Sequence, residues 1–486
     1  EPWSRCALFG GVDVTSCTRS DTWQWPGITE KWIYPQLAFL PMTFAWLFAW
    51  AVGYTPAWAI TVALFNLIAF VVLVGSGRSR GRVIAAWFWL AAILLIGPVG
   101  IYRIDGITVP FAILGGIWML RRPFLASVLL SVSVWMKVWP AAILAAGVDP
   151  ELAGLAARVG VAEGLLCGVT TVADHHLTWP VSLSTEDSVD LATAVADAAA
   201  SLGGRLVFVR GSARDDPQQA AQSADAIATA LAPRTADGML QLAVGPAGVH
   251  SDSRETFELL AEVAARHGLR RRTQSNEQVD VAIALERYGA RPLDLLEEWG
   301  WLAPDVTLAH LCDVSAPEIA RLAAAGVTAT HAPGCDVPMG WGVAPVAALR
   351  AAGIPVGLGT SGGGSNDAGH LLADARLALQ VSALVGEQLP ARDVLAMATR
   401  GSATGLGRDD LGHLGAGSAG DACVWDVSGV ADAGVADPVA GLLWASPGRR
   451  PKHVVVGGRV VVRDYALVDA DERELAARLR ERLTAH

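Results

Sequence analysis

Residues 32–77 form a run of 46 residues that contains no charged side chain. A helix needs about 20 apolar residues to cross the hydrocarbon core of a bilayer, so this run is long enough for two membrane spans. Gly53–Pro56 interrupts the run near its middle, and glycine and proline are typical of turns. The run predicts two transmembrane helices joined by a tight turn. Buried helices of a large soluble protein are the alternative, although apolar runs of this length rarely occur outside membranes.

Further apolar stretches follow this run. They are Val83–Tyr102, predicted as a third span, Gly106–Leu120, predicted as a fourth span or a re-entrant segment, and Pro123–Val148, a fifth candidate that contains Lys137. The first 145 residues also hold 12 of the 18 Trp residues, and Trp is enriched where a protein meets the membrane interface. We therefore expect residues 32–145 to contact membrane lipid and the chain to be a multi-pass membrane protein.

Two segments of this apolar block resemble the membrane glycosyltransferases that use polyprenol-phosphate sugars. These segments are Gly97–Asp105 and Lys137–Ala142, and the resemblance covers roughly residues 32–145. In that family the catalytic acid lies in an early extracytoplasmic loop. Asp13 and Asp21 precede the first predicted span, but their spacing does not mark either as catalytic. The resemblance implies a glycosyltransferase fragment.

Charge divides the chain into two different parts. The first 145 residues hold 10 Lys and Arg against 5 Asp and Glu, whereas residues 146–486 hold 27 against 42, a net charge of −15. Cytoplasmic loops carry an excess of Arg and Lys, which predicts that Arg78–Arg82 and Arg121–Arg122 face the cytoplasm. An acidic C-terminal part excludes nucleic acid as a partner, because a polyanion would be repelled. We expect this part to have cytoplasmic character.

The C-terminal part shows short β-rich runs that alternate with helical stretches, which is typical of parallel βα units. We predict three domains: a transmembrane block at 1–146, a barrel at 147–410 that lacks strand one, and an accessory β-sheet region with a terminal helix at 411–486. A closed barrel of this type needs eight strands, so seven make an incomplete (β/α)8 TIM-like barrel. The seven predicted strands are Gly168–Ala173, Arg205–Arg210, Gln241–Gly245, Leu269–Thr273, Val306–His310, Val327–His331 and Ile354–Gly359, and the accessory sheet is predicted at Asp421–Val427 and His453–Tyr465.

Polar residues collect at the carboxyl ends of the predicted strands. A single histidine at a strand end is most often structural, but barrel enzymes place their chemistry at this face. Several polar strand ends that converge on one mouth therefore predict a functional site. The residues concerned are Asp174–His176, Gln274–Glu277, His310, His331 and Ser361–Asp367.

Four motifs in this part resemble the amidohydrolase superfamily, in its branch of triazine hydrolases and 8-oxoguanine deaminases. The resemblance runs from about Val148 to the C-terminus, with the motifs in family order and at family spacing. It implies hydrolysis of C–N or C–Cl bonds on a small nitrogen heterocycle by a metal-bound hydroxide, with zinc or iron as the metal. The motifs are Ala329–Pro333, Met339–Pro345, Gly357–Gly362 with Ser365–Asp367, and Ala398–Ala403 with Leu406–Arg408.

The resemblance also implies roles for individual residues. His310 matches the metal ligand after family strand six, and Glu277 matches the glutamate that shuttles protons. By the same resemblance we expect Trp341, Asn366 and Asp367 to contact the substrate.

The chain departs from the family's ligand set at three points. Gln274 stands where the strand-five histidine is expected, and Ser361 stands where most members carry an aspartate. The chain contains no His-x-His pair, which the family places after strand one. Gln274, Ser361 and His331 are further candidate ligands, but a catalytic zinc site normally has three protein ligands, so metal occupancy is in doubt.

Three functions are consistent with the sequence. The first is an amidohydrolase that acts on C–N bonds, impaired because the His-x-His motif is absent. The second is a membrane glycosyltransferase remnant, and the third is a non-catalytic fusion of two genes joined near Ala146. Metal content separates the first from the third.

A missing strand also leaves two sheet edges open, which predicts pairing between copies and hence a homo-oligomer.

Overall fold

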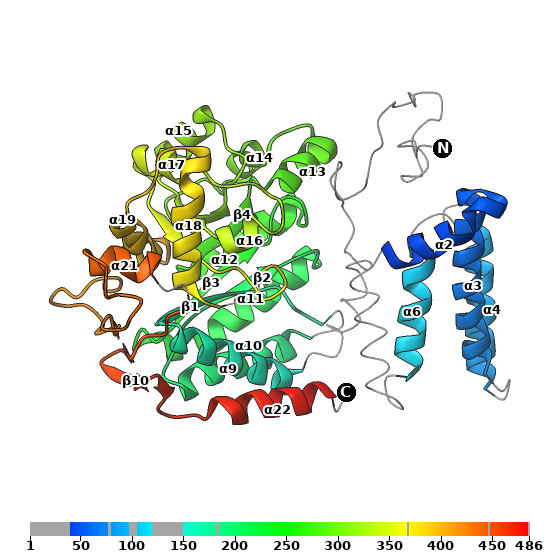
Figure 1. Ribbon diagram of the computed structural model, residues 1–486, viewed down its shortest axis with the longest axis horizontal. Helices are drawn as coiled ribbons and strands as arrows, with labels where there is room; N and C mark the ends of the chain where they lie inside the picture. The colour runs from blue at the N-terminus through cyan, green and yellow to red at the C-terminus, as the bar shows by residue number, and fades with distance from the viewer. Residues whose placement is uncertain are drawn as a thin grey trace. The chain divides into compact units, whose positions relative to one another are not determined.

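The computed structural model describes residues 39–75, 79–96, 105–118, 149–180, 184–366, 369–445 and 448–484 (Figure 1). The chain divides into two compact units, one of residues 1–147 with 481–486 and one of residues 148–480. The boundaries predicted at 146 and 410 stay predictions, because this division does not test them.

The N-terminal unit contains four described helices. They are α2 (Phe39–Val52), α3 (Tyr54–Val74), α4 (Arg80–Ile96) and α6 (Asp105–Trp118). Gly53 separates α2 from α3 with a φ of 82°, a left-handed value that favours glycine, so the predicted break in the uncharged run is real. A small core of apolar side chains joins α2, α3 and α6: Ala45, Ala57, Trp58, Val62 and Ile107.

Helix length decides which of these elements are able to cross a bilayer. In the described ranges, only α3, with 21 residues, is both long and apolar enough. The described parts of α2 and α6 have 14 residues each and that of α4 has 17, and each adjoins residues outside the described ranges. The candidate span Pro123–Val148 lies outside the described residues, as do most of Gly97–Asp105 and all of Lys137–Ala142. A multi-pass arrangement therefore stays a prediction.

The C-terminal unit is built on one seven-stranded parallel sheet whose spatial order follows the chain. All seven predicted strands are confirmed, with ends that shift by a few residues. Strand β2 is buried at every position, as expected for a parallel strand that is covered on both faces. The strands are β1 (Thr171–His176), β2 (Arg205–Ser212), β3 (Leu240–Pro246), β4 (Arg270–Ser275), β5 (Val306–His310), β6 (Thr328–His331) and β7 (Val356–Leu358).

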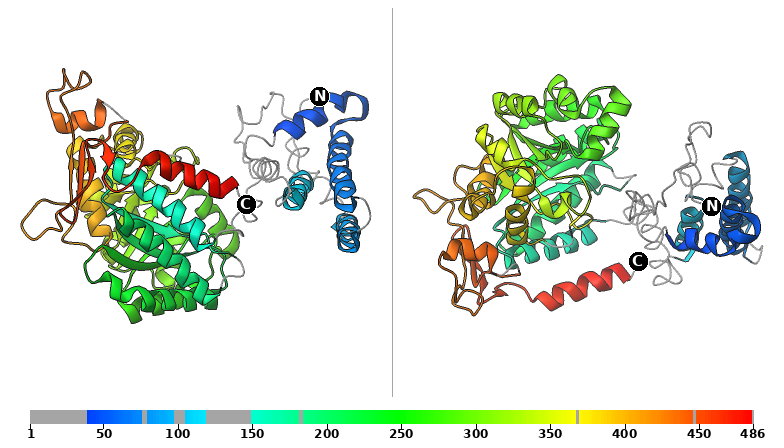
Figure 2. Two further views of the ribbon diagram at one scale, coloured as in Figure 1. Left: turned by 90° about the horizontal axis from the view of Figure 1, so that it is seen from below. Right: turned by 45° about the horizontal axis from the view of Figure 1, so that its top comes forward.

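Helices follow the strands and lie outside the curled sheet (Figures 1 and 2). Local signals start several of them, such as the capping box of Ser184 with Asp187 and the Asp216 cap followed by proline. The helices are α9 (Pro150–Leu166), α10 (Thr185–Ser201), α11 (Pro217–Leu231), η3 (Ala232–Thr235), α12 (Arg254–His267), α13 (Gln278–Tyr288), α14 (Pro292–Glu298), α15 (Ala316–Ala325), α16 (Pro333–Asp336), α17 (Val346–Ala351), α18 (Leu371–Val385), α19 (Ala391–Ala396), η4 (Met397–Gly401) and α20 (Ser402–Gly405).

The sheet is an open half-barrel. Among the described residues β1 and β7 are its outermost strands and do not pair with each other, so the predicted incomplete barrel is confirmed. The outer edge of β7 is partly satisfied by a side chain, because Ser402 Oγ accepts a hydrogen bond from the backbone N–H of Leu358 at 3.1 Å. A hydroxyl therefore takes part of the place that a neighbouring strand would fill.

A second, antiparallel sheet follows the half-barrel in the chain. Its order is β11–β10–β9–β8, formed by β8 (Ala422–Val424), β9 (His453–Val456), β10 (Arg459–Arg463) and β11 (Ala466–Leu467), which confirms the predicted accessory sheet. Val454 and Val462 share one buried cluster with Leu206 and Phe208 of β2, so the two sheets belong to one unit. Figure 2 shows this sheet at one side of the half-barrel, with α21 (Pro438–Trp444) and α22 (Glu472–Thr484) near it.

Candidate active site

Two predicted site residues meet at the carboxyl ends of neighbouring strands. His310 is the last residue of β5 and pairs in register with Ser275, the last residue of β4, while Glu277 follows two residues later. Glu277 Oε1 lies 3.6 Å from Nε2 of His310. Because parallel strands end at the same edge of the sheet, the fold alone brings these two groups together.

A turn at Asn276 positions Glu277. Asn276 has a φ of 58°, a left-handed conformation that asparagine tolerates, and its side chain donates to the carbonyl of Asp313 at 2.8 Å. Its backbone N–H donates to Oδ2 of Asp280 at 2.8 Å, and Oδ1 of the same carboxylate lies 3.1 Å from Nδ1 of His250. The buried Asp280 thus connects the turn before Glu277 to the loop after β3.

Glu277 has the environment of a proton-transfer group. Its side chain is 1% exposed, and Oε1 has no hydrogen-bond partner among the described residues. Burial raises the pKa of Glu277 to about 6, although His310 and His250 act against this rise. A carboxyl group with such a pKa can both accept and release a proton near neutral pH.

His310 is held by a buried carboxylate. Its Nδ1 lies 2.5 Å from Oδ1 of Asp336, a residue with no exposed surface. Burial alone lowers the pKa of His310, but the hydrogen bond and the charge of Asp336 outweigh it and raise the pKa above its usual value. The backbone at His310 and Leu311 adopts left-handed φ values of 75° and 54°, a conformation that side chains rarely adopt and that recurs at functional sites.

His331 lies on the other side of Asp336. Its Nδ1 is 3.8 Å from Oδ2 of Asp336, and both atoms are buried without a hydrogen-bond partner in the described part of the chain. Burial lowers the pKa of His331 to about 4, so this imidazole is neutral at pH 7. Three buried atoms without partners, on Glu277, His331 and Asp336, therefore lie close to His310.

Among the other predicted site residues, Trp341 contacts His310, whereas Asn366 and Ser361 contact residues outside the Glu277–His310 pair. The Trp341 ring packs edge-on against the His310 ring with centroids 5.3 Å apart, while Asn366 donates to the carbonyl of Thr360 and to Asp374. The exposed Ser361 hydroxyl contacts that of Ser365 at 3.2 Å. Gln274 is partly buried near the end of β4, and Asp367 lies outside the described residues.

Sequence reasoning missed Asp336 and Cys335. Both are buried in α16, the single turn that follows β6, and one donor atom each from His310, Cys335 and Asp336 lies within 4.8 Å of the others. The signal was present in the chain, because the two residues follow the strand that ends at His331. Their contact with His310 depends on the path of the loop, which the sequence does not state.

The residues present do not fit the zinc or iron site that the resemblance implies. Of the implied ligands, His310 alone is an imidazole, since Gln274 and Ser361 occupy two positions and the sequence holds no His-x-His pair. A neutral amide and an exposed hydroxyl are much weaker zinc ligands than imidazole. The buried group of His310, Cys335 and Asp336 is a different donor set at the same strand ends.

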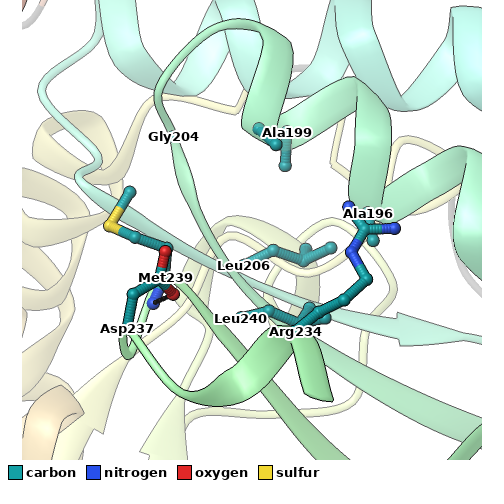
Figure 3. A pocket seen from close by; sticks show the side chains of 9 residues that line it. Ala196, Ala199, Gly204, Leu206, Arg234, Asp237, Met239 and Leu240 are labelled. Carbon is teal, nitrogen blue, oxygen red and sulfur yellow. Dashed lines mark hydrogen bonds between the residues drawn. The ribbon is translucent and has the colours of Figure 1, made fainter. Parts of the chain in front are cut away.

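A separate pocket lies at the opposite ends of the strands, where β2 and β3 begin. In Figure 3 the side chains of Arg234 and Asp237 flank an apolar floor of Leu206 and Leu240. The guanidinium of Arg234 donates a hydrogen bond to Asp197 at 2.7 Å, so Asp197 already balances its charge. The lining residues are Ala196, Ala199, Ala200, Gly204, Leu206, Arg234, Asp237, Met239 and Leu240, and none of them belongs to the site above.

This half-barrel, with a buried glutamate and histidine at its strand ends, is that of a known class of hydrolases. The model of the Amidohydrolase family matches residues 119–461, and the chain belongs to that family. The match begins before the described part of the half-barrel, within the block predicted as membrane-embedded.

Among its relatives is 8-oxoguanine deaminase of Pseudomonas aeruginosa, which is 36% identical over 372 residues, 72% of this chain and 80% of the relative. A 5-methylthioadenosine/S-adenosylhomocysteine deaminase of Halobacterium salinarum is 30% identical over 361 residues, with the same two coverages. The crystal structure of atrazine chlorohydrolase from Arthrobacter aurescens, complexed with zinc, superposes with a TM-score of 0.64 at 36% identity, covering 69% of this chain and 77% of that one.

Proposed function

We propose that this chain is a hydrolase that acts on a C–N bond of a small nitrogen heterocycle, and that its incomplete ligand set lowers the rate. The observation that supports this most directly is the contact of Glu277 with His310 at 3.6 Å inside a family half-barrel. Two relatives are deaminases of purine compounds, and a third acts on a triazine. A flat nitrogen ring is the substrate feature that they share.

The chain's own residues would bind the ring and move a proton. Glu277, with a pKa of about 6, would accept a proton from the attacking water and deliver it to the leaving nitrogen. His310 presents Nε2 toward Glu277 because Asp336 holds its Nδ1. Trp341 covers one edge of His310 and would exclude water from that side. Contacts of Trp341, Asn366 and Asp367 with the substrate stay predictions from the resemblance.

Ammonia release by the full-length chain tests this proposal, with 8-oxoguanine as the probe and zinc or iron in excess. We expect turnover more than about 100-fold slower than that of the Pseudomonas relative, since lost support around a metal alone costs about 10- to 100-fold. Glu277→Gln should lower this rate by about 100-fold or more, because general acid–base catalysis contributes about that much. Glu286→Gln, on the exposed face of α13, is the matched control.

Three results would contradict the proposal. A folded Glu277→Gln variant with the wild-type rate would remove Glu277 from the chemistry. Complete absence of turnover in the wild-type chain would favour the non-catalytic fusion instead. Turnover as fast as that of the relative would show that the ligand set is not impaired.

For the N-terminal unit we propose a location in the membrane, with residues 32–145 in contact with lipid. Support comes from α3, which is long and apolar enough to span, and from large apolar side chains that α2, α3 and α4 expose, such as Trp50 at 86% and Phe88 at 73%. Arg80 and Arg82 at the start of α4 would face the cytoplasm. The glycosyltransferase remnant stays a prediction from the resemblance of Gly97–Asp105 and Lys137–Ala142.

A further inference from the structure

We infer that His310, Cys335 and Asp336 form a binding site for a divalent cation of the zinc type. One nitrogen, one sulfur and one oxygen donor lie within 4.8 Å of one another. The three residues are 3%, 0% and 0% exposed. This donor set differs from the one that the family resemblance implies, and the inference concerns binding alone, so it does not rest on the proposed hydrolysis.

The fold holds the three side chains in place without a metal. His310 ends β5, and Cys335 and Asp336 lie in α16, which follows the neighbouring strand β6. The carbonyl of Ala332 accepts hydrogen bonds from the backbone N–H groups of both Cys335 and Asp336 at 3.0 Å. This single turn fixes two adjacent residues beside the end of β5, so the donors are arranged before a ligand arrives.

Unsatisfied buried atoms point to a ligand of positive charge. Oδ2 of Asp336 is buried without a hydrogen-bond partner among the described residues, and so is Nδ1 of His331, 3.8 Å away. Oε1 of Glu277, 3.6 Å from Nε2 of His310, is also buried without a hydrogen-bond partner among the described residues. A buried carboxylate oxygen without a protein hydrogen-bond donor is unfavourable in the interior, and a bound cation offsets that cost.

Cys335 supplies the sulfur donor of the group. Its buried thiol lies within hydrogen-bonding reach of the hydroxyls of Ser365 and Ser361. A metal ion displaces the thiol proton when it binds. Ser361 stands at a position where the family usually has a metal ligand. Here its hydroxyl would contact the ligand Cys335 and not the metal.

The His310 and Asp336 side chains must move apart to hold a cation between them. Their Nδ1 and Oδ1 atoms are 2.5 Å apart, below the roughly 2.7–2.9 Å of charge-assisted N–H···O bonds. Zinc bonds of about 2.0 Å to nitrogen and oxygen at a tetrahedral angle place two ligands about 3.3 Å apart. The cation would take the place of the proton between them. Sulfur and imidazole donors favour zinc or cobalt over magnesium or calcium.

Cobalt titration of the metal-stripped full-length chain tests the inference. We expect one equivalent of Co²⁺ to bind and to produce a near-ultraviolet thiolate-to-cobalt charge-transfer band, which zinc abolishes by displacement. Cys335→Ser should remove this band and weaken binding at least tenfold, and Asp336→Asn should weaken binding by a similar factor. Cys423→Ser, in β8 of the accessory sheet, is the matched control and should retain both.

The wild-type chain gives a measurement that does not depend on the folding of any variant. X-ray absorption of its zinc form should show one sulfur ligand together with nitrogen and oxygen ligands. No bound metal, or a zinc shell without sulfur, would overturn the inference. So would binding that survives Cys335→Ser but is lost in Gln274→Ala, because the ion would then occupy a ligand position implied by the family. Metal binding without any turnover would support this inference and contradict the proposed function.

Discussion

Glu277 Oε1 and His310 Nε2 are 3.6 Å apart although they belong to different βα units. Their strands, β4 and β5, are paired in parallel from Arg271 with Val306 to Ser275 with His310. The pair is therefore assembled in the middle of the sheet, away from the open edges at β1 and β7. The Glu277–His310 pair is therefore formed although the described sheet has no eighth strand. Any metal ligands that the missing strand would carry are absent from this sheet.

Gly245 in β3 lies too close to the backbone of β4 to carry a side chain. A Cβ atom at this position would lie 1.7 Å from the carbonyl oxygen of Arg272 in β4, a distance that only movement of backbone could relieve. We expect Gly245→Ala to destabilise the protein by about 3 kcal/mol or more. Gly160→Ala in α9, where nothing lies within 4 Å, should instead be neutral or stabilising by up to about 1 kcal/mol. Chemical denaturation measures the stability of both variants. Equal stabilities of Gly245→Ala and Gly160→Ala would contradict the predicted backbone clash.

Ser402 protects the outer edge of β7. Its Oγ accepts from the N–H of Leu358 and also lies 3.1 Å from the Leu358 carbonyl. Ser402→Ala leaves that N–H without its partner, which should cost about 1 to 3 kcal/mol. Ser428→Ala, at an exposed position, should change stability by less than about 0.5 kcal/mol. If the two variants unfold at the same denaturant concentration, Ser402 does not act as an edge cap.

Asp374 connects two loops beside the site. It is 3% exposed and accepts hydrogen bonds from the N–H of Gly334 at 2.8 Å and from Asn366 at 3.2 Å. Asp374→Ala should destabilise the protein by about 2 kcal/mol and loosen the turn that carries Cys335. Cobalt affinity should fall with it. Asp374→Asn keeps an oxygen that accepts from Gly334, so it should retain more of the stability and more of the cobalt affinity. Wild-type stability in Asp374→Ala would contradict this role of Asp374.

His175 should make stability depend on pH. It lies at partial exposure in β1, its Nε2 is 2.8 Å from the carbonyl of Gly245, and burial lowers its pKa to about 4. The unfolded chain has a histidine pKa of about 6.5 and takes up this proton first as pH falls. Stability should therefore be lost between about pH 6.5 and 4, by about 2 kcal/mol.

The His175→Gln variant isolates this contribution, because it keeps an amide donor for Gly245 but does not titrate. Urea denaturation at pH 7, 5.5 and 4 should show wild-type stability falling more steeply than that of the variant. Parallel pH profiles would show that His175 is protonated equally in the folded and unfolded chains.

The full-length chain should partition into membranes. The apolar side chains exposed on α2, α3 and α4 are costly in water, at about 25 cal/mol per Å² of apolar surface. Alkaline carbonate extraction should leave the chain in the membrane pellet, while residues 148–486 expressed alone should not be retained there. Recovery of the full-length chain in the supernatant without detergent would contradict a membrane location.

Local patterns in the sequence were sufficient for much of the fold. Seven parallel strands and the accessory sheet could be placed because each is a short β-rich run between helical stretches, and alternation of this kind depends on neighbours in the chain. The break at Gly53 was equally visible, since glycine has the left-handed freedom that the turn requires.

The sequence by itself determined the division into an apolar basic part and an acidic βα part, and the placing of Glu277 and His310 at consecutive strand ends. Only the tertiary structure decided which groups surround them. Asp336 and Cys335 reach His310 through a single turn after β6, and the Ser402 hydroxyl reaches Leu358 from a segment beyond the last strand. Such contacts join residues far apart in the chain. They arise from the way strands and loops pack in three dimensions, and that packing has no counterpart in the spacing of residues along the sequence.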